Sequence, residues 1–170
     1  MTLSAFDWTL FSFLSILGFS VVWFYSGYKK QQDSKYAYLP AAFGIKLLGG
    51  AIFAIIFFYF YKVGDTFLYF SGSMKFSHFF WENPDLYFKA LFSNSEETLR
   101  MIPGIHHEIP YARTNEEWFM VRILSLFQII SFNNYLILIF WTSFFSFIGS
   151  WAIFEVFNSW FKSSTKLAFA

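Results

Sequence analysis

Residues 59–66 of the chain, Tyr-Phe-Tyr-Lys-Val-Gly-Asp-Thr, separate two kinds of sequence. Before this stretch the chain is mostly apolar, and after it comes a polar segment rich in aromatic residues. A glycine followed by a carboxylate is a common way to end one helix and begin another at a polar surface. Asp65, at this boundary, is therefore the first residue to consider for function.

The composition is that of a membrane protein. Of the 170 residues, 56% are hydrophobic, 26% are aromatic and only 14% are charged. These proportions suit lipid-facing helices with aromatic side chains at the membrane surface, and we expect one membrane domain over residues 1–170. A net charge of +1 provides no basic face for nucleic acid, so partners are expected to be lipid or protein. The absence of cysteine excludes disulfides and thiolate chemistry.

The hydropathy pattern predicts an all-α, polytopic fold with about four transmembrane helices. At 1.5 Å per residue, about 20 apolar residues cross the hydrocarbon layer. The third predicted span begins after Thr114, which forms a capping-box pattern with Glu117. This helix is barely long enough to cross, and its alternative is a helix lying on the membrane surface. The predicted spans are residues 8–28, 41–61, 115–132 and 135–157.

The lysines predict the orientation of the chain in the membrane. Residues 29–39 contain three lysines, so the positive-inside rule places this loop in the cytoplasm. Residues 63–114 then form one large outer loop, which is periplasmic if the membrane is a bacterial inner membrane. Four spans would put Lys162 and Lys166 outside as well, against the same rule. Either the third helix does not cross, or more chain follows.

The outer loop is expected to form interfacial amphipathic helices. Aromatic clusters alternate with polar or glycine-containing breaks, and such clusters can insert into the lipid headgroups. Residues 101–113 come next and contain two prolines, so an ordered turn or loop is expected there. The predicted breaks between the helices are residues 71–73, 82–85 and 93–95.

Two predictions concern the spans themselves. Lys46 is the single charge of the second span, and we expect its side chain to extend along the helix to the cytoplasmic surface. Thr142, Ser146 and Ser150 recur every four residues in the last span and predict a ridge for contact with another helix.

Asp65 and Arg122 are the leading candidates for chemistry. A carboxylate at the membrane surface beside Lys62 can act as a general base toward a sugar or lipid-linked substrate. The alternative is that Asp65 only caps a helix, and the local sequence pattern taken alone favours this alternative. The guanidinium of Arg122 can bind a phosphate through two parallel hydrogen bonds. Its structural alternatives are an ion pair with Asp65 or Glu117, or extension of the side chain to the membrane surface.

Three further residues are candidates for substrate binding. His106 and His107 are adjacent in the predicted loop, where we expect their rings to point apart and to form hydrogen bonds. The spacing does not favour a metal site, and we expect neither a metal nor a cofactor. Tyr69 belongs to the aromatic residues that follow Asp65 and are expected to shape an acceptor groove.

Three segments together resemble a known group of proteins: residues 61–69, Tyr-Lys-Val-Gly-Asp-Thr-Phe-Leu-Tyr; residues 118–127, Trp-Phe-Met-Val-Arg-Ile-Leu-Ser-Leu-Phe; and residues 133–136, Asn-Asn-Tyr-Leu. The chain resembles polytopic inner-membrane proteins of Bacteroidetes, which are distantly similar to C-type glycosyltransferases and polysaccharide polymerases. The resemblance implies a polyprenyl-phosphate carrier as substrate and places the catalytic aspartate of the first outer loop at Asp65. It covers roughly residues 45–155, which is the N-terminal part of such an enzyme.

Two functions follow as hypotheses. In the first, the chain is part of a glycosyltransferase or polymerase of the cell envelope, in which Asp65 is the base and Arg122 holds the carrier phosphate. In the second, it is a non-catalytic subunit of a larger membrane complex, and Asp65 is a cap. The partners are accordingly a lipid carrier together with other membrane subunits or a missing C-terminal half.

Overall fold

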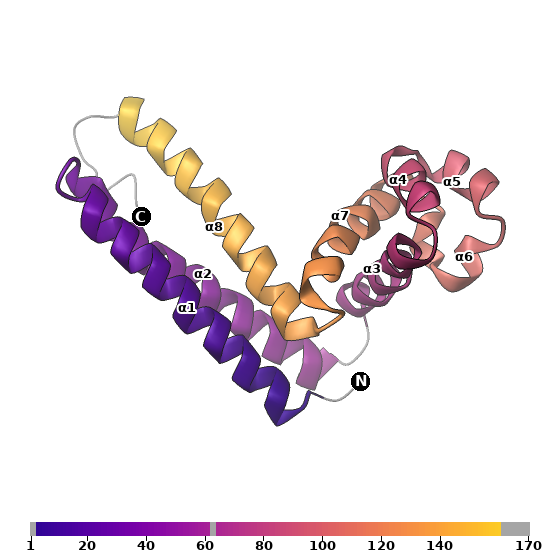
Figure 1. The fold of residues 1–170 in the computed structure, drawn as a ribbon, viewed down its shortest axis with the longest axis horizontal. Coiled ribbons are helices and arrows are strands. Elements are labelled where there is room, and N and C mark those ends of the chain that lie inside the picture. Colours follow the sequence, from indigo (N-terminus) through magenta and orange to yellow (C-terminus); the bar gives the residue numbers. More distant parts are fainter. Residues whose placement is uncertain (1–2, 62–63, 161–170) are drawn as a thin grey trace. The chain divides into compact units, whose positions relative to one another are not determined.

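The computed structural model describes residues 3–61 and 64–160, and these residues are helical with no β-strand among them. The chain divides into two compact units, the first made of Met1–Ala54 with Ile139–Ala170 and the second of Ile55–Leu138 (Figure 1). Three helices in the described part of the chain are long and apolar enough to cross a membrane. The all-helical class is therefore confirmed, and the structure is consistent with a membrane protein.

The first unit is built from three long helices. They are α1 (Ala5–Lys29), α2 (Leu39–Ile56) and the part of α8 (Tyr135–Trp160) that begins at Ile139. Ser4 starts α1 with a capping box, in which its hydroxyl accepts from the backbone N–H of Asp7. The short 3₁₀ helix η1 (Ser34–Tyr38) connects α1 to α2. These bounds agree with the predicted first, second and last spans.

Aromatic side chains pack the three helices together. Phe43 on α2 is fully buried, and its ring centroid lies 6.0 Å from that of Phe144 and 5.2 Å from that of Phe147 on α8. On α1, a Cβ added to Gly18 would lie 3.2 Å from the rings of Phe43 and Phe140. A small residue at Gly18 therefore allows α1 to approach the other two helices closely.

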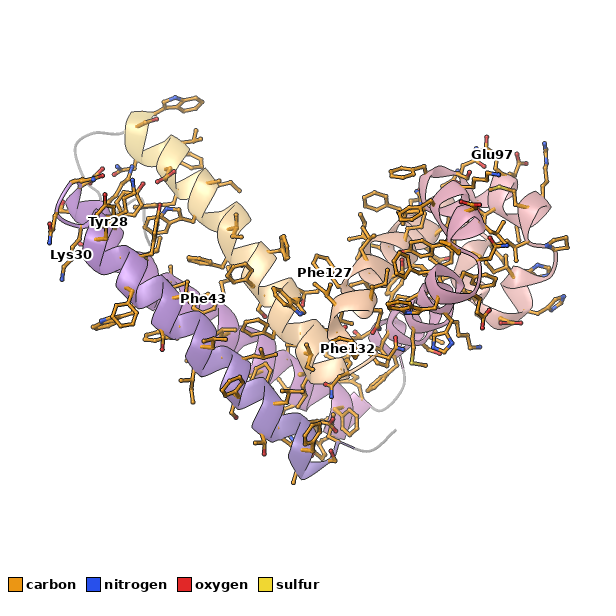
Figure 2. The ribbon with its side chains drawn as sticks, viewed as in Figure 1. Tyr28, Lys30, Phe43, Glu97, Phe127 and Phe132 are labelled. Atoms are coloured by element: carbon orange, nitrogen blue, oxygen red, sulfur yellow. The ribbon has the colours of Figure 1, made fainter. Side chains whose placement is uncertain are left out.

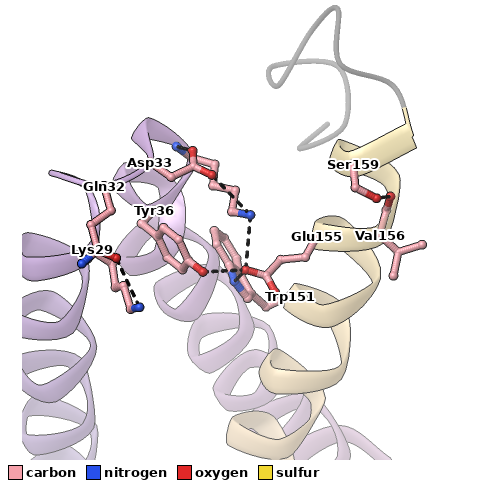
Figure 3. Close-up of polar contacts among 9 residues, drawn as sticks. Lys29, Gln32, Asp33, Tyr36, Trp151, Glu155, Val156 and Ser159 are labelled. Atoms are coloured by element: carbon pink, nitrogen blue, oxygen red, sulfur yellow. Dashed lines mark hydrogen bonds and ion pairs between the residues drawn. The ribbon is translucent and has the colours of Figure 1, made fainter.

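A polar cluster fixes the direction of α8. The Tyr36 hydroxyl of η1 donates to Oε1 of Glu155 over 2.9 Å, and Trp151 Nε1 donates to the same oxygen over 3.3 Å (Figure 3). The Lys35 ammonium lies 3.6 Å from that carboxylate oxygen. The end of α8 thus lies beside the start of α2, and the two helices run in opposite directions.

The second unit consists of shorter helices between α2 and α8. The π-helical segment η2 (Phe57–Tyr61) is the end of the second candidate span. Asn83, Asn94 and Thr114 are the N-caps of α4, α5 and α7, and each side chain accepts from a backbone N–H. The elements that follow η2 are α3 (Asp65–Glu82), α4 (Pro84–Phe92), α5 (Ser95–Met101), α6 (Ile105–Glu108), η3 (Pro110–Ala112) and α7 (Asn115–Ser131).

These helices enclose a core of their own. Phe76 on α3 is fully buried, with its ring centroid 4.7 Å from that of Trp118 and 4.8 Å from that of Tyr87. Burying three such rings removes about 150–250 Å² of surface each from solvent, which is a large share of the stability of a small unit. The expectation that the loop aromatics face the headgroups is therefore wrong for Phe76 and Tyr87.

The predicted break at residues 71–73 is also wrong, because α3 continues through it. Gly72 is buried at this point, and a Cβ there would lie 3.0 Å from Ile109 and 3.5 Å from Val121. The glycine therefore serves close packing and not helix termination. The other two breaks are confirmed, since α4 begins after Asn83 and α5 begins after Asn94.

The predicted count of four spans is not confirmed. The helix predicted at residues 115–132 is present as α7, and it starts at Asn115 as the Thr114 cap predicts. However, α7 is not among the three helices long and apolar enough to cross. Because α8 runs antiparallel to α2, the chain between them leaves and returns at the same end of the first unit.

Candidate functional site

The backbone at Gly64 fixes the position of Asp65. Gly64 is the N-cap of α3 and has φ 141° and ψ 178°, a conformation that is essentially restricted to glycine. Asp65 is the first residue of the helix and is exposed. A carboxylate in the first turn of a helix is stabilised by the helix dipole. The Gly-Asp sequence therefore presents a carboxylate to solvent from a fixed turn.

Two tyrosines lie next to Asp65. The Tyr111 hydroxyl of η3 donates to Oδ1 of Asp65 over 2.5 Å. The Tyr111 ring lies against that of Tyr69, one helical turn beyond Asp65 on α3, with 4.6 Å between the centroids. A short hydrogen bond to an ionised acceptor is among the stronger kinds in proteins. Asp65 is thus held through one oxygen by one member of a pair of packed aromatic rings.

The electrostatic environment of both tyrosines is acidic. The hydrogen bond to Asp65, with burial and the charges of Asp65 and Glu117 adding to it, raises the pKa of Tyr111 to about 12. Burial raises the pKa of Tyr69, and the charges of Glu117 and Asp65 raise it further. Glu117 is held in place by the Thr114 hydroxyl, which donates to its Oε2 over 2.8 Å. Both phenols therefore stay protonated at neutral pH and act as donors.

We define the acidic tyrosine cluster as Asp65, Tyr69, Tyr111 and Glu117. It combines two carboxylates that accept hydrogen bonds with two phenol rings that offer apolar faces and hydroxyl donors. Such a set suits a ligand that carries several hydroxyl groups. Because Tyr111 occupies Oδ1 of Asp65, Oδ2 is the oxygen on which that carboxylate would receive a proton from a ligand hydroxyl.

The structure gives Arg122 a structural role. Its Nη1 donates to the carbonyl of Leu91 over 2.9 Å and to that of Ser93 over 2.7 Å, at the end of α4. A cation at a helix C-terminus satisfies free carbonyls and complements the helix dipole. The side chain is half-buried, and no salt bridge within residues 3–61 and 64–160 involves Arg122 or Asp65. An ion pair between Arg122 and Asp65, one of the structural alternatives for Arg122, is therefore not observed in this part of the chain.

The other predicted site residues are placed differently. His106 and His107 lie in α6, and their ring centroids are 4.0 Å apart, so the expectation that the rings point apart is wrong. Burial lowers the pKa of His106, and the charges of His107 and Arg113 lower it further. Lys62, proposed as the neighbour of Asp65, lies outside the described residues.

Sequence reasoning did not find Tyr111 and Glu117 as members of the site. Tyr111 follows Pro110 in a segment predicted only as a turn or loop, and the predictions for Glu117 are a helix cap and an ion pair with Arg122. Their meeting with Asp65 and Tyr69 depends on the packing of η3 and α7 against α3, which is a contact distant in sequence. The one available signal was Pro110, which marks an ordered turn before Tyr111.

Compared with protein-family models, with curated proteins and with solved structures, the chain gives no match.

Proposed function

We propose that this chain is part of a membrane protein that transfers or polymerises lipid-linked sugars at the cell envelope, with Asp65 as the general base. The observation that carries the proposal is the exposed Asp65 carboxylate, held on one oxygen by the Tyr111 hydroxyl within the acidic tyrosine cluster. The resemblance of residues 61–69 and 118–127 to envelope glycosyltransferases supports the same function.

In the proposed reaction, Asp65 takes the proton of an acceptor hydroxyl. The acceptor oxygen then attacks the anomeric carbon of the sugar on a polyprenyl phosphate carrier. The bond between that carbon and the carrier phosphate oxygen breaks, and the phosphate leaves with the electron pair. Tyr69 and Tyr111 would contact the face of the acceptor sugar, and Glu117 would accept hydrogen bonds from its other hydroxyls. The proton passes from Asp65 to water.

The proposed location is a bacterial inner membrane, with residues 63–114 in the periplasm. The three lysines of residues 29–39 support a cytoplasmic position for η1, and three spans return the end of α8 to that same side. Lys162 and Lys166 then also follow the positive-inside rule, which removes the conflict that four spans create. The remaining parts of the carrier site would come from partner subunits or from further chain.

Asp65→Asn in the native host tests the proposal. Asparagine keeps the size of the side chain and can accept from Tyr111, but it is too weak a base to take the proton. We expect loss of a surface glycan and accumulation of a lipid-linked sugar, with the protein still inserted in the membrane. Asp85→Asn is the matched control, because Asp85 is an exposed carboxylate in the first turn of α4. An unchanged glycan profile in the Asp65 variant would contradict the proposal.

The second candidate is a non-catalytic helical subunit of a larger membrane complex. The contacts of Arg122 favour this candidate, because the guanidinium proposed to bind phosphate is already hydrogen-bonded to carbonyls at the end of α4. In this case Asp65 only begins α3 and anchors η3 through Tyr111. Asp65→Asn would then leave the sugar pools unchanged, whereas loss of the whole chain would lower the amounts of its partner subunits.

A further inference from the structure

The Lys46 side chain lies within the first unit's candidate spans and contacts α8 near its middle. Lys46 is about 10 Å from the start of α2 at Leu39 and about 22 Å from the end of the candidate span at Tyr61. Its ammonium donates to Ser146 Oγ on α8 over 3.3 Å. Ser146 is itself about 16 Å from the start of α8, Tyr135. The ammonium therefore contacts a hydroxyl of a neighbouring helix, and the prediction that it extends to the cytoplasmic surface stays a prediction.

The described residues of the first unit form no salt bridge with this ammonium. In the described part of the chain, the salt bridges join Lys35 to Asp33 and to Glu155, and neither involves Lys46. A serine hydroxyl supplies a dipole but no compensating charge. Ionisable groups in a membrane interior are costly, and they are usually paired or used for function. The position of Lys46 therefore calls for an anionic group from outside the described residues.

An open groove between α2 and α8 leads to Lys46 from both directions. Its two parts, of about 380 Å³ and about 540 Å³, share Ile45 and Lys46. The walls are mainly apolar side chains and small residues, among them Gly49 and the exposed Ser146 and Ser150. Small residues allow the backbone of another helix to approach closely. The groove therefore offers the shape of a helix-packing surface with one cation in its floor.

We propose that this groove receives a transmembrane helix of a partner protein that carries an aspartate or glutamate at its middle. The carboxylate would pair with Lys46, and the partner helix would pack against the small residues of α2 and α8. This inference concerns the first unit alone and does not depend on the sugar-transfer proposal.

The alternative occupants fit the groove less well. A second copy of the described chain offers Asp7 and Glu155 in its spans, but Asp7 caps α1 and Glu155 is bound by Tyr36, Trp151 and Lys35. Both carboxylates also lie near helix ends and not at the depth of Lys46. A lipid phosphate belongs to the headgroup layer, and reaching the level of Lys46 would take it about 10 Å past the start of α2.

The test uses model transmembrane peptides and the full chain in phosphatidylcholine vesicles. The peptides share a leucine-alanine sequence and carry glutamate, glutamine or leucine at the central position. Because the chain has no cysteine, Gln31→Cys in the exposed turn after α1 provides one site for a fluorescent label. Energy transfer from labelled peptide to labelled protein reports association. The variants are Lys46→Met and Lys46→Glu, with Lys30→Met as a control at the end of α1.

We expect the glutamate peptide to associate with the wild-type chain at about tenfold lower peptide density than the glutamine peptide. Lys46→Met should remove this preference, and Lys30→Met should keep it. Lys46→Glu should instead prefer a peptide with a central lysine. Removing a charge from a span favours insertion, and a helical circular-dichroism spectrum for Lys46→Met would show that its loss of binding is not unfolding.

Two results would overturn the proposal. One is equal association of the glutamate and glutamine peptides with the wild-type chain. The other is displacement of the glutamate peptide when anionic phosphatidylglycerol is added to the vesicles, provided that this effect of the lipid is absent in Lys46→Met. That result would show that a lipid phosphate occupies the groove.

Discussion

The two compact units place their aromatic side chains in opposite ways. In the first unit, α1 exposes Phe24 at 77% and Trp23 at 61%, and Tyr28 projects outward from the same helix (Figure 2). In the second unit, Phe76 and Trp118 are fully buried against each other. Large apolar side chains stay exposed on a stable helix when the surrounding medium is apolar, whereas buried rings stabilise a fold in water.

This difference shows what each unit needs from its surroundings. The first unit has little interior. In the most apolar stretch of α1, for example, only 11% of the residues are buried. Its stability must come from lipid or from partner helices, and the polar contact of Tyr36 with Glu155 lies near a helix end. The second unit contains its own core and presents the acidic tyrosine cluster from it. A high aromatic content alone therefore does not identify a membrane span.

The largest expected effect is from Phe76→Ala. Removing a fully buried ring should destabilise the second unit by about 3–5 kcal/mol. Phe24→Ala, which removes an exposed ring of α1, should leave that unit's stability unchanged. Hydrogen exchange in detergent micelles measures both effects, through the amides of α3 and α7 for Phe76→Ala and through those of α1 for Phe24→Ala. Unchanged protection of α3 and α7 in Phe76→Ala would show that the second unit has no independent core.

Arg122→Ala should have the next largest effect. It removes two hydrogen bonds from a charged donor to the Leu91 and Ser93 carbonyls, which is worth about 1.5–3 kcal/mol. Exchange should increase first at the end of α4. Arg100→Ala, at an exposed position of α5, is the control. If Arg122 instead serves a phosphate ligand, α4 would keep its protection and only ligand binding would change.

Gly64→Ala tests the turn that presents Asp65. The conformation of Gly64 costs a residue with a side chain about 1–3 kcal/mol, although a Cβ there would meet no atom within 4 Å. Gly149→Ala has equally open space in α8 without a positive φ and should be neutral. Thermal unfolding in micelles separates the two variants. A neutral Gly64→Ala would show that the turn is not required.

The smallest effect on stability is expected from Asp65→Asn. The pKa of the Tyr111 phenol is the quantity that reports it. The hydrogen bond to Asp65 raises the pKa of Tyr111 from 10.0 to about 12, so the bond stabilises the fold below pH 10 and is lost as the pH rises through 12. In Asp65→Asn the pKa of Tyr111 should fall toward 10.0. Tyrosinate absorbance of the variant, with Tyr111→Phe as reference, follows this change. An unchanged titration would mean that the two side chains do not interact.

The sequence predicted much of the fold. The long apolar helices of the first, second and last predicted spans, the Thr114 cap and two of the three loop breaks follow from local patterns, such as Thr114 before Glu117 and Asn83 before Pro84. Gly72 misled the prediction because a glycine in a helix permits close packing as well as a break, and only the positions of Ile109 and Val121 distinguish the two. The role of Arg122 likewise depends on where α4 ends relative to α7.

The site was predictable only in Asp65 and Tyr69, which lie four residues apart in the sequence. Gly64 and Asp65 form a local signal, since glycine is required for the turn and the carboxylate begins the helix. Tyr111 is 46 positions from Asp65 in the sequence, and it and Glu117 come to lie near Asp65 only when the intervening segment folds. No local pattern encodes that meeting.

The most direct test of the central claim is the rate of sugar transfer in membranes isolated from the native host, which retain any partner subunits. Transfer from the endogenous lipid-linked sugar to acceptor is compared among wild type, Asp65→Asn and Asp85→Asn, with equal amounts of inserted protein. The proposed role of Asp65 predicts that transfer is lost in Asp65→Asn and kept in Asp85→Asn. Equal rates in all three membranes would contradict it and favour the non-catalytic subunit.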